Sequence, residues 1–146
     1  MDPVDAVVMR LRAIWVALLA SVVLYVVVAE MMTRADFAEI RMLHRGFIAV
    51  MILFVGVAVV LRQRMVRPFE EEVWSGRFST GGAPSPEQTA LAGRWQGGQI
   101  VSWILCEAVA WFGFALRFLG ASQLKAWPFY AVAVLLMVVW TPRRPG

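Results

Sequence analysis

The stretch Gln99–Leu119, QIVSWILCEAVAWFGFALRFL, decides the class of fold. It is apolar over about the 20 residues that a helix needs to cross a bilayer, yet it contains one acidic residue, Glu107. Three further apolar runs accompany it, at residues 13–32, 42–61 and 126–141. The last of these is short and needs its flanking residues to reach both membrane surfaces. The sequence therefore predicts an all-α membrane protein with four transmembrane helices in a single domain, residues 1–146.

The composition agrees with a membrane protein and argues against other classes. The chain has 146 residues, 60% of them hydrophobic, with a formal net charge of +4, one cysteine and one histidine. A nucleic-acid-binding domain gathers its basic residues on a soluble face, whereas here the arginines bracket the apolar runs. One cysteine and one histidine leave no CxxC motif and no histidine pair. We therefore expect no metal, no cofactor and no nucleic-acid partner.

The distribution of basic residues predicts the orientation, because cytoplasmic loops carry an excess of arginine and lysine. With four spans and both termini on one side, that side carries nine basic residues and the other side carries five. The cluster RQRMVR, residues 62–67, contributes most, because it follows the second run directly. We expect an integral protein of the plasma membrane, which is the inner membrane if the protein is bacterial. Both termini and the connection 62–98 are expected in the cytoplasm.

The connection 62–98 changes character along its length. It opens basic, turns acidic at PFEEEVW (residues 68–74), and becomes rich in Gly, Ser and Pro over residues 75–86, which predicts a flexible middle. Ser85 and Gln88 then have the spacing of a capping box, which predicts a helix that lies on the membrane or runs into the third span. On the opposite side, residues 33–41 predict an interfacial helical turn or a continuation of the first helix.

The third run carries a stripe of small and polar side chains. Such side chains recur every three or four residues after Gln99, at Ser102, Cys106, Ala110 and Gly113. In lipid, small residues allow helix backbones to approach closely, and hydroxyl groups can join neighbouring helices. The stripe therefore predicts a helix-packing face.

Glu107 lies at the edge of this stripe, about 12 Å along the helix from Gln99 and near the middle of a hydrocarbon core about 30 Å thick. A charged carboxylate is costly at that depth, so Glu107 must be protonated, paired or in contact with water. Ser21 and Tyr25 lie one turn apart at middle depth of the first run. We predict a protonated Glu107 that is hydrogen-bonded to Tyr25 or Ser21. It either binds a proton or cation, or orients helices.

A second acidic residue, Glu30, and a basic residue, Arg117, both lie at the ends of spans that face away from the predicted cytoplasmic side. An ion pair between the first and third spans is one arrangement of these residues. The other is that their side chains extend to the lipid headgroups, as long charged side chains do near helix ends.

The segment ILCEAVAWFG, residues 104–113, resembles the carboxylate helix of the proteolipid ring subunits of rotary ATPases. In that family, a Glu within a pattern like CEAVAIYG carries the proton or sodium ion. The matching positions are Cys106, Glu107, Ala108, Val109, Ala110 and Gly113. The resemblance implies that Glu107 is an ion-binding carboxylate. As a whole, the chain is similar in architecture to small four-span membrane proteins of bacteria.

No nucleophile–base pair, metal-ligand cluster or phosphate loop occurs in the sequence, so we expect no enzymatic activity. The prediction is a small integral membrane protein that contacts the lipid bilayer and serves as an accessory subunit of a larger membrane complex or associates with itself. The alternative is a subunit that translocates protons or cations through Glu107. A second alternative is a small multidrug-type transporter, since such exporters also have four short helices and a membrane Glu.

Overall fold

The computed structural model of the chain describes residues 3–32, 41–74 and 85–142, which are helical almost throughout and contain no strand. The helical elements are α1 (Pro3–Met32), α2 (Arg41–Leu61), the π-helical turn η1 (Arg62–Val66), α3 (Arg67–Trp74), α4 (Pro86–Phe118) and α5 (Gln123–Val139). Three helical stretches are long and apolar enough to cross a membrane, and α5 is a shorter apolar helix. The predicted all-helical class is thus confirmed. The turn predicted near residues 33–40 and the flexible middle at 75–84 lie outside the described residues.

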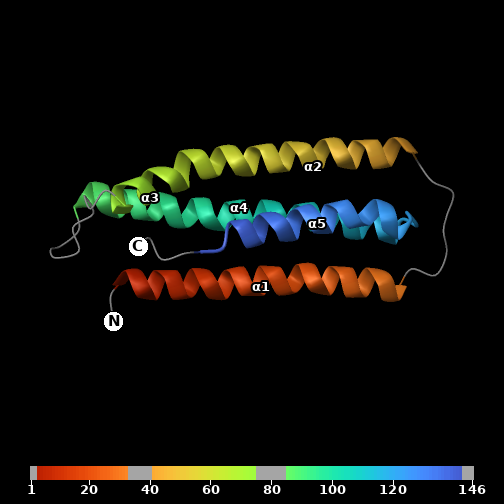
Figure 1. Cartoon of the computed structure of the whole chain (residues 1–146), viewed down its shortest axis with the longest axis horizontal. Coiled ribbons are helices and arrows are strands. Elements are labelled where there is room, and N and C mark those ends of the chain that lie inside the picture. The colour runs from red at the N-terminus through yellow and green to blue at the C-terminus, as the bar shows by residue number, and fades with distance from the viewer. Residues whose placement is uncertain (1–2, 33–40, 75–84, 143–146) are drawn as a thin grey trace.

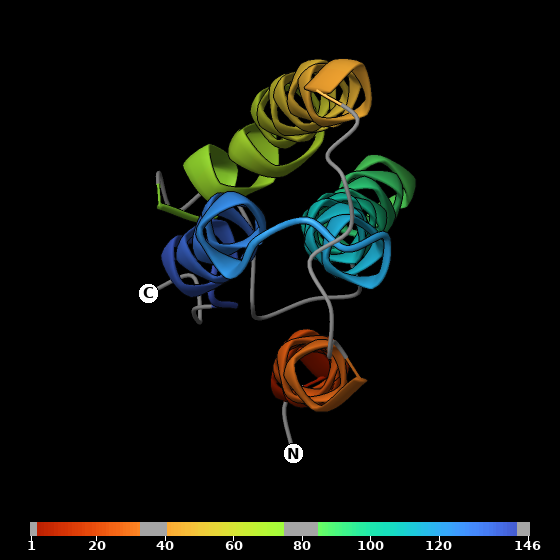
Figure 2. The same ribbon diagram turned by 90° about the vertical axis from the view of Figure 1, so that its right-hand side faces the viewer.

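The helices form an elongated bundle with α4 at its centre (Figure 1), and α4 contacts α1, α2, α3, η1 and α5. Seen along the bundle, α4 and α5 make a middle layer, with α2 on one side and α1 on the other (Figure 2). The helices α1 and α4 run in the same direction, and α2 and α5 run in the opposite one. We call the end where α1 and α4 begin the terminal end, and the opposite end the far end.

The start of α4 is fixed by a complete capping box. The Ser85 hydroxyl accepts a hydrogen bond from the backbone N–H of Gln88, and the Gln88 side chain accepts one from the backbone N–H of Ser85. Pro86 occupies the first turn, where its missing N–H costs nothing. From there α4 runs for 33 residues, about 50 Å, which exceeds the hydrocarbon core by roughly 20 Å.

Helical structure extends into the connection that the sequence predicts as a cytoplasmic loop over residues 62–98. The chain passes from α2 through η1 into α3 and is helical as far as Trp74, and α4 already begins at Pro86. Its charges suggest a loop, but α3 is amphipathic: Phe69 is buried while Glu71 is exposed. Phe69 stacks on Trp95 of α4, with 4.9 Å between ring centroids. This contact gives the charged helix an apolar partner.

The turn η1 brings the chain unusually close to α4. A Cβ atom placed on Gly98 of α4 would lie 2.7 Å from the Cβ of Met65 and 3.1 Å from the Cγ2 of Val66. Only glycine allows the two backbones to approach this closely. Figure 1 shows the chain bending toward α4 between α2 and α3, which is the kind of bend that a π-helical turn produces.

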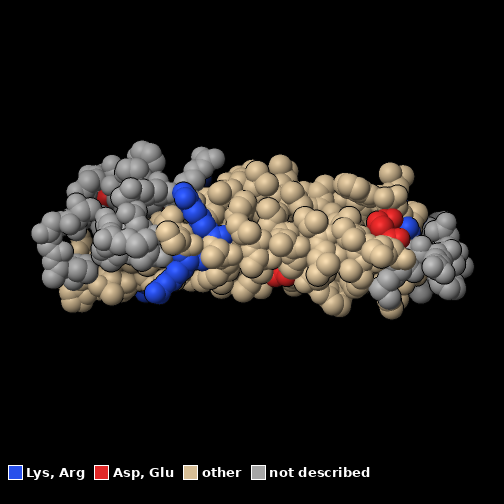
Figure 3. Space-filling view, turned by 90° about the horizontal axis from the view of Figure 1, so that it is seen from below, with Lys and Arg blue, Asp and Glu red and all other residues tan. Residues whose placement is uncertain are grey.

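The core lies between α4 and α5, and the outer faces are apolar. Buried core side chains of these two helices include Trp103, Cys106, Val109, Ala110, Phe129, Ala133 and Met137. In contrast, α1 and α2 expose large apolar side chains such as Val23, Leu24, Ile52 and Leu53. In the face drawn in Figure 3, charged groups gather toward the two ends, and a small acidic patch interrupts the uncharged middle. These exposed apolar faces are compatible with lipid contact.

Candidate functional site

The central candidate site joins α1 and α4 at the carboxyl group of Glu107. The Ser21 Oγ lies 2.5 Å from Glu107 Oε1, and the Tyr25 hydroxyl lies 3.0 Å from the same oxygen. Both partners come from successive turns of α1, which runs alongside α4 in the same direction. Glu107 itself is half-buried, so its carboxyl group lies at the edge of the interface and not deep within it.

A count of protons shows that this site accommodates two forms of the carboxyl group. Ser21 Oγ also lies 2.7 Å from the carbonyl oxygen of Leu18, but a serine hydroxyl carries a single proton and donates to only one oxygen at a time. If Glu107 is protonated, it donates to Ser21 while Ser21 donates to Leu18. If Glu107 is ionised, Ser21 turns and donates to the carboxylate. Tyr25 donates to Glu107 in both forms, so rotation of one hydroxyl satisfies either state.

Among the described residues, no basic side chain forms an ion pair with Glu107. The described residues contain ion pairs between Arg62 and Glu70 and between Arg117 and Glu30, and Glu107 takes part in neither. A search of the described residues also finds no group of three His, Cys, Asp or Glu side chains that could hold a metal ion. The nearby groups are hydroxyls that donate and accept hydrogen bonds. They can accept a hydrogen bond from a carboxylic acid or donate one to a carboxylate.

The predicted packing stripe lies on the buried side of α4. Ser102, Cys106 and Ala110 are at most 1% exposed, and Gly113 is buried as well. A Cβ on Gly113 would lie 3.0 Å from the Cβ of Phe129 on α5, so the two helices are close at this point. The Ser102 hydroxyl donates to the carbonyl oxygen of Gly98 at 2.7 Å, within its own helix. Its hydrogen bond therefore does not join two helices.

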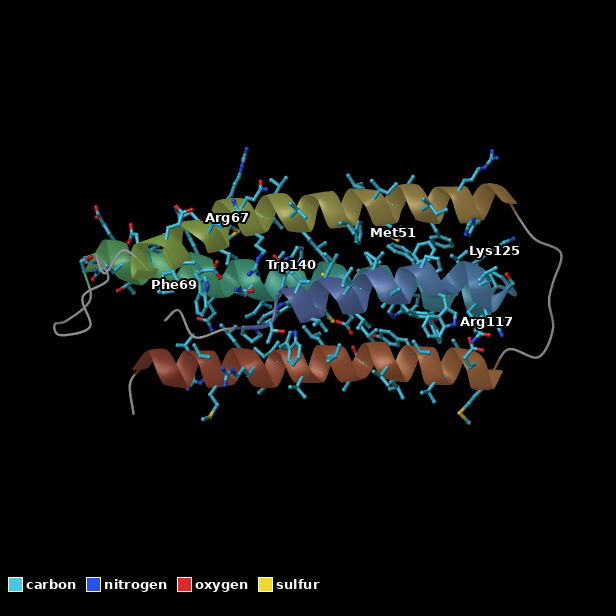
Figure 4. All side chains as sticks on the ribbon, in the orientation of Figure 1. Met51, Arg67, Phe69, Arg117, Lys125 and Trp140 are labelled. Carbon is cyan, nitrogen blue, oxygen red and sulfur yellow. The ribbon has the colours of Figure 1, made fainter. Side chains whose placement is uncertain are left out.

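Glu30 and Arg117 form a two-point ion pair at the far end of the bundle. Arg117 Nε donates to Glu30 Oε1 at 3.2 Å, and Arg117 Nη2 donates to Glu30 Oε2 at 3.3 Å. Arg117 Nη1 also donates to the carbonyl oxygen of Ala121 at 3.0 Å. The Arg117 side chain lies between the middle layer and α1 (Figure 4). Of the two arrangements open from the sequence, the structure has the ion pair, which links the far ends of α1 and α4.

A second polar cluster, which the sequence did not predict, lies around Arg62 of η1, on the terminal side of Glu107. Arg62 Nη1 donates to the side-chain oxygen of the buried Gln99 at 3.0 Å. Its Nη2 lies 3.7 Å from Glu70 Oε1, and the guanidinium carbon lies 5.4 Å from the ring centroid of Trp140. The sequence feature that could have indicated this cluster is Gln99, a lone amide side chain at the start of an apolar run. Its partner lies 37 positions earlier, and no local pattern specifies that pairing.

Two tryptophans satisfy carbonyl groups near the C-terminal end of α5. The last four carbonyl groups of a helix lack partners within the helix, and the hydrocarbon core offers no water to replace them. Trp15 of α1 donates its indole N–H to the carbonyl oxygen of Met137 at 2.9 Å. Trp103 of α4 donates to the carbonyl oxygen of Trp140 at 3.1 Å. These bonds allow the short helix α5 to end inside the bundle.

Comparison of the chain with protein-family models, curated proteins and solved structures gives no match. The function is therefore inferred from the contacts around Glu107 and from the arrangement of the helices.

Proposed function

We propose that this chain is a small, non-enzymatic subunit of a membrane assembly in which Glu107 takes up and releases a proton within the bilayer. One observation carries the proposal. Ser21 Oγ lies within hydrogen-bonding distance of both Glu107 and the Leu18 carbonyl oxygen, so the site has a hydrogen-bonded arrangement for the acid and another for the carboxylate. The resemblance to the proteolipid carboxylate helix points to the same residue.

A proton-binding role explains why the residue is an acid. A charged carboxylate at the helix centre costs about 2.5–3.5 kcal/mol on insertion scales, whereas a neutral glutamine would offer the same hydroxyls an acceptor. Other bonds already attach α1 to the middle layer, namely the Glu30–Arg117 ion pair and the hydrogen bond from Trp15 to Met137. The position therefore does not need an ionisable group to hold α1 in place.

A second candidate function keeps Glu107 as a purely structural residue of an accessory subunit. The observation that favours it is that Ser21 and Tyr25 both belong to α1, so both hydrogen bonds cross between two helices. In this alternative, the bonds set the rotation of α1 against α4, and the carboxyl group never changes its protonation.

For the orientation, we propose that the terminal end faces the cytoplasm. Described arginines gather there on several elements, at Arg10, Arg12, Arg62, Arg64, Arg67 and Arg94. The far end carries fewer described basic residues, namely Arg41, Arg45, Arg117 and Lys125, and Arg117 is paired with Glu30. An excess of arginine on the cytoplasmic side is the usual pattern of inner-membrane proteins. In this orientation the bundle has both termini in the cytoplasm and α4 crosses from inside to outside.

Proton uptake by the purified protein in lipid nanodiscs separates the two functions. The wild type and Glu107→Gln are moved from alkaline to mildly acidic pH, and the protons taken up per chain are counted. If Glu107 binds a proton reversibly, the wild type takes up one more proton per chain than Glu107→Gln. Equal uptake by two equally stable proteins would overturn the proton-binding role and leave the structural one.

A further inference from the structure

Tyr130 of α5 carries a buried hydroxyl that the Glu107 site does not use. The residue is 3% exposed, and its hydroxyl has no hydrogen-bond partner among the described residues. A buried hydroxyl without a partner is unfavourable, and ordered water commonly satisfies such groups in proteins. A polar group in this state therefore points to a bound water molecule.

Contacts with α4 place Tyr130 between the Glu107 site and the far end. A Cβ on Gly113 would lie 3.2 Å from Cε1 of Tyr130, so the tyrosine ring packs directly on Gly113. Gly113 lies six positions beyond Glu107 on α4, about 9 Å further toward the far end. Arg117 follows one turn later and forms the ion pair with Glu30. Along the axis of α4, Tyr130 thus lies between Glu107 and that ion pair.

The pairing of α1 with α4 places Tyr130 between the partners of Glu107 and Glu30. The two helices run in the same direction. Ser21 bonds to Glu107 and Glu30 bonds to Arg117, so residues of α1 lie level with α4 residues 86 or 87 positions later in the chain. Gly113, on which Tyr130 packs, is therefore level with residues 26–27 of α1, beyond Tyr25 and before Glu30. The orphan hydroxyl is thus on the far-end side of the site.

On the terminal side of Glu107, three polar side chains of α4 have protein partners. Ser102 is fully buried and donates to Gly98, and Trp103 is fully buried and donates to the Trp140 carbonyl. The buried Gln99 accepts from Arg62. Closer to the terminal end, the buried indole N–H of Trp95 has no partner among the described residues. An indole N–H only donates hydrogen bonds, whereas the hydroxyl of Tyr130 can both accept and donate, so only the group on the far-end side of Glu107 can pass a proton on.

We propose that Tyr130 binds a water molecule that connects Glu107 to the Glu30–Arg117 end, so that Glu107 exchanges its proton with the far side of the membrane. The inference rests on the proposed proton-binding role of Glu107. Transfer needs no other reactant, because each oxygen along the path accepts one proton and releases another. Tyr130 is a positioning residue in this scheme, since it holds the water and does not touch the carboxyl group.

The rate of hydrogen–deuterium exchange at the Glu107 carboxyl group tests this route. The exchange is followed by the isotope shift of the carboxylic-acid C=O band in infrared spectra of the full chain in nanodiscs. Tyr130→Phe removes only the orphan hydroxyl, and Ser102→Ala is the matched variant on the terminal side of Glu107. We expect exchange in Tyr130→Phe to be slower by about tenfold or more, which corresponds to about 1.4 kcal/mol in the barrier. We expect Ser102→Ala to exchange like the wild type.

Two controls keep the result interpretable. The frequency of the C=O band should be unchanged in Tyr130→Phe, because the hydroxyl does not contact Glu107, and the thermal midpoint should stay close to that of the wild type. Wild-type exchange in Tyr130→Phe, or slow exchange in Ser102→Ala alone, would overturn the far-end route while leaving proton binding intact. Absence of any carboxylic-acid band in the wild type would instead contradict the proposed function itself.

Discussion

At the scale of single residues, the carboxyl group of Glu107 is compatible with the bilayer because α1 supplies hydroxyl groups at the right depth. Ser21 and Tyr25 both reach Glu107 Oε1, and Ser21 has a second acceptor in Leu18. A short, polar side chain such as serine can back-bond to its own helix and thus needs no fixed partner on α4. The site therefore keeps its hydrogen bonds whichever way the proton moves.

A double-mutant cycle tests whether Tyr25 and Glu107 interact energetically. Tyr25→Phe removes a donor that lies 3.0 Å from the carboxyl oxygen, so the hydrogen bond is lost while the ring contact with Phe114 stays. Hydrogen bonds between membrane helices contribute about 0.6 kcal/mol on average. We expect Tyr25→Phe to lower the free energy of unfolding by about that amount in the wild type, and by clearly less in the Glu107→Leu background.

The measurement is reversible unfolding in mixed micelles for the wild type, both single variants and the double variant. Residues in contact show a coupling energy, and the cycle isolates it when each single variant removes the interaction without creating a new one. If the effects of Tyr25→Phe and Glu107→Leu simply add, the hydrogen bond contributes nothing to stability and the structural part of the account is wrong.

At the scale of helical elements, α4 is the part on which the bundle is built. Its small residues set two close approaches, with η1 at Gly98 and with α5 at Gly113. Its Trp103 and the Trp15 of α1 satisfy carbonyl groups at the end of α5. The end of a helix in the hydrocarbon core needs such donors, because no water is present to replace them. This explains how a helix of only 17 residues fits beside one of 33.

Adjacent glycines on α4 provide a matched test of the contact with η1. In Gly98→Ala the new Cβ meets Met65 Cβ at 2.7 Å, an atom next to the backbone that cannot move away, so we expect a loss of about 1–3 kcal/mol of stability. In Gly97→Ala nothing lies within 4 Å of the new Cβ, so helix propensity alone predicts a gain of up to about 1 kcal/mol.

Thermal unfolding of the two variants, measured side by side in the same detergent, gives the comparison. Opposite shifts of the midpoint support the close packing of η1 on α4. Equal shifts would show that η1 does not pack on Gly98 as described.

The sequence is informative about helices and less so about how they pair. Long apolar runs and the Ser85–Gln88 capping box predict where helices form, because both signals are local. Local signals do not predict the helical continuation through η1 and α3, because the charges there are typical of a loop. The contact that stabilises this helix, Phe69 on Trp95, joins residues far apart in the sequence. Counting residues from the helix ends gives the depth of Ser21, Tyr25 and Glu107. The pairing of Arg62 with Gln99 depends on the register between two helices, which no local pattern encodes.

At the scale of the whole molecule, the centre of the bundle is well packed and its sides expose large apolar side chains. The core lies between α4 and α5, whereas α1 and α2 present apolar faces outward, including Val23, Leu24, Ile52 and Leu53. Lipid covers such faces in a monomer, and neighbouring subunits cover part of them in a complex. Because the proposed function is that of a subunit, we expect some of this surface to be occupied by protein in the native membrane.

Native mass spectrometry of the assembly, gently extracted from membranes, tests this expectation. One chain has a mass of 16.3 kDa, and we expect a defined assembly that is several times heavier. A closed set of identical copies would support the likeness to ring subunits, and a fixed complex with other proteins would support an accessory role. A bare monomer would contradict the subunit proposal.

The protonation state of Glu107 tests the central claim most directly. Infrared difference spectra of wild type and Glu107→Gln in lipid nanodiscs isolate the signal of this one carboxyl group. We predict a hydrogen-bonded carboxylic-acid C=O band that is present in the wild type, is absent in Glu107→Gln, and gives way to carboxylate bands when the pH is raised. A wild type that shows only carboxylate bands, or an acid band that no pH removes, would contradict a proton that binds and leaves at Glu107.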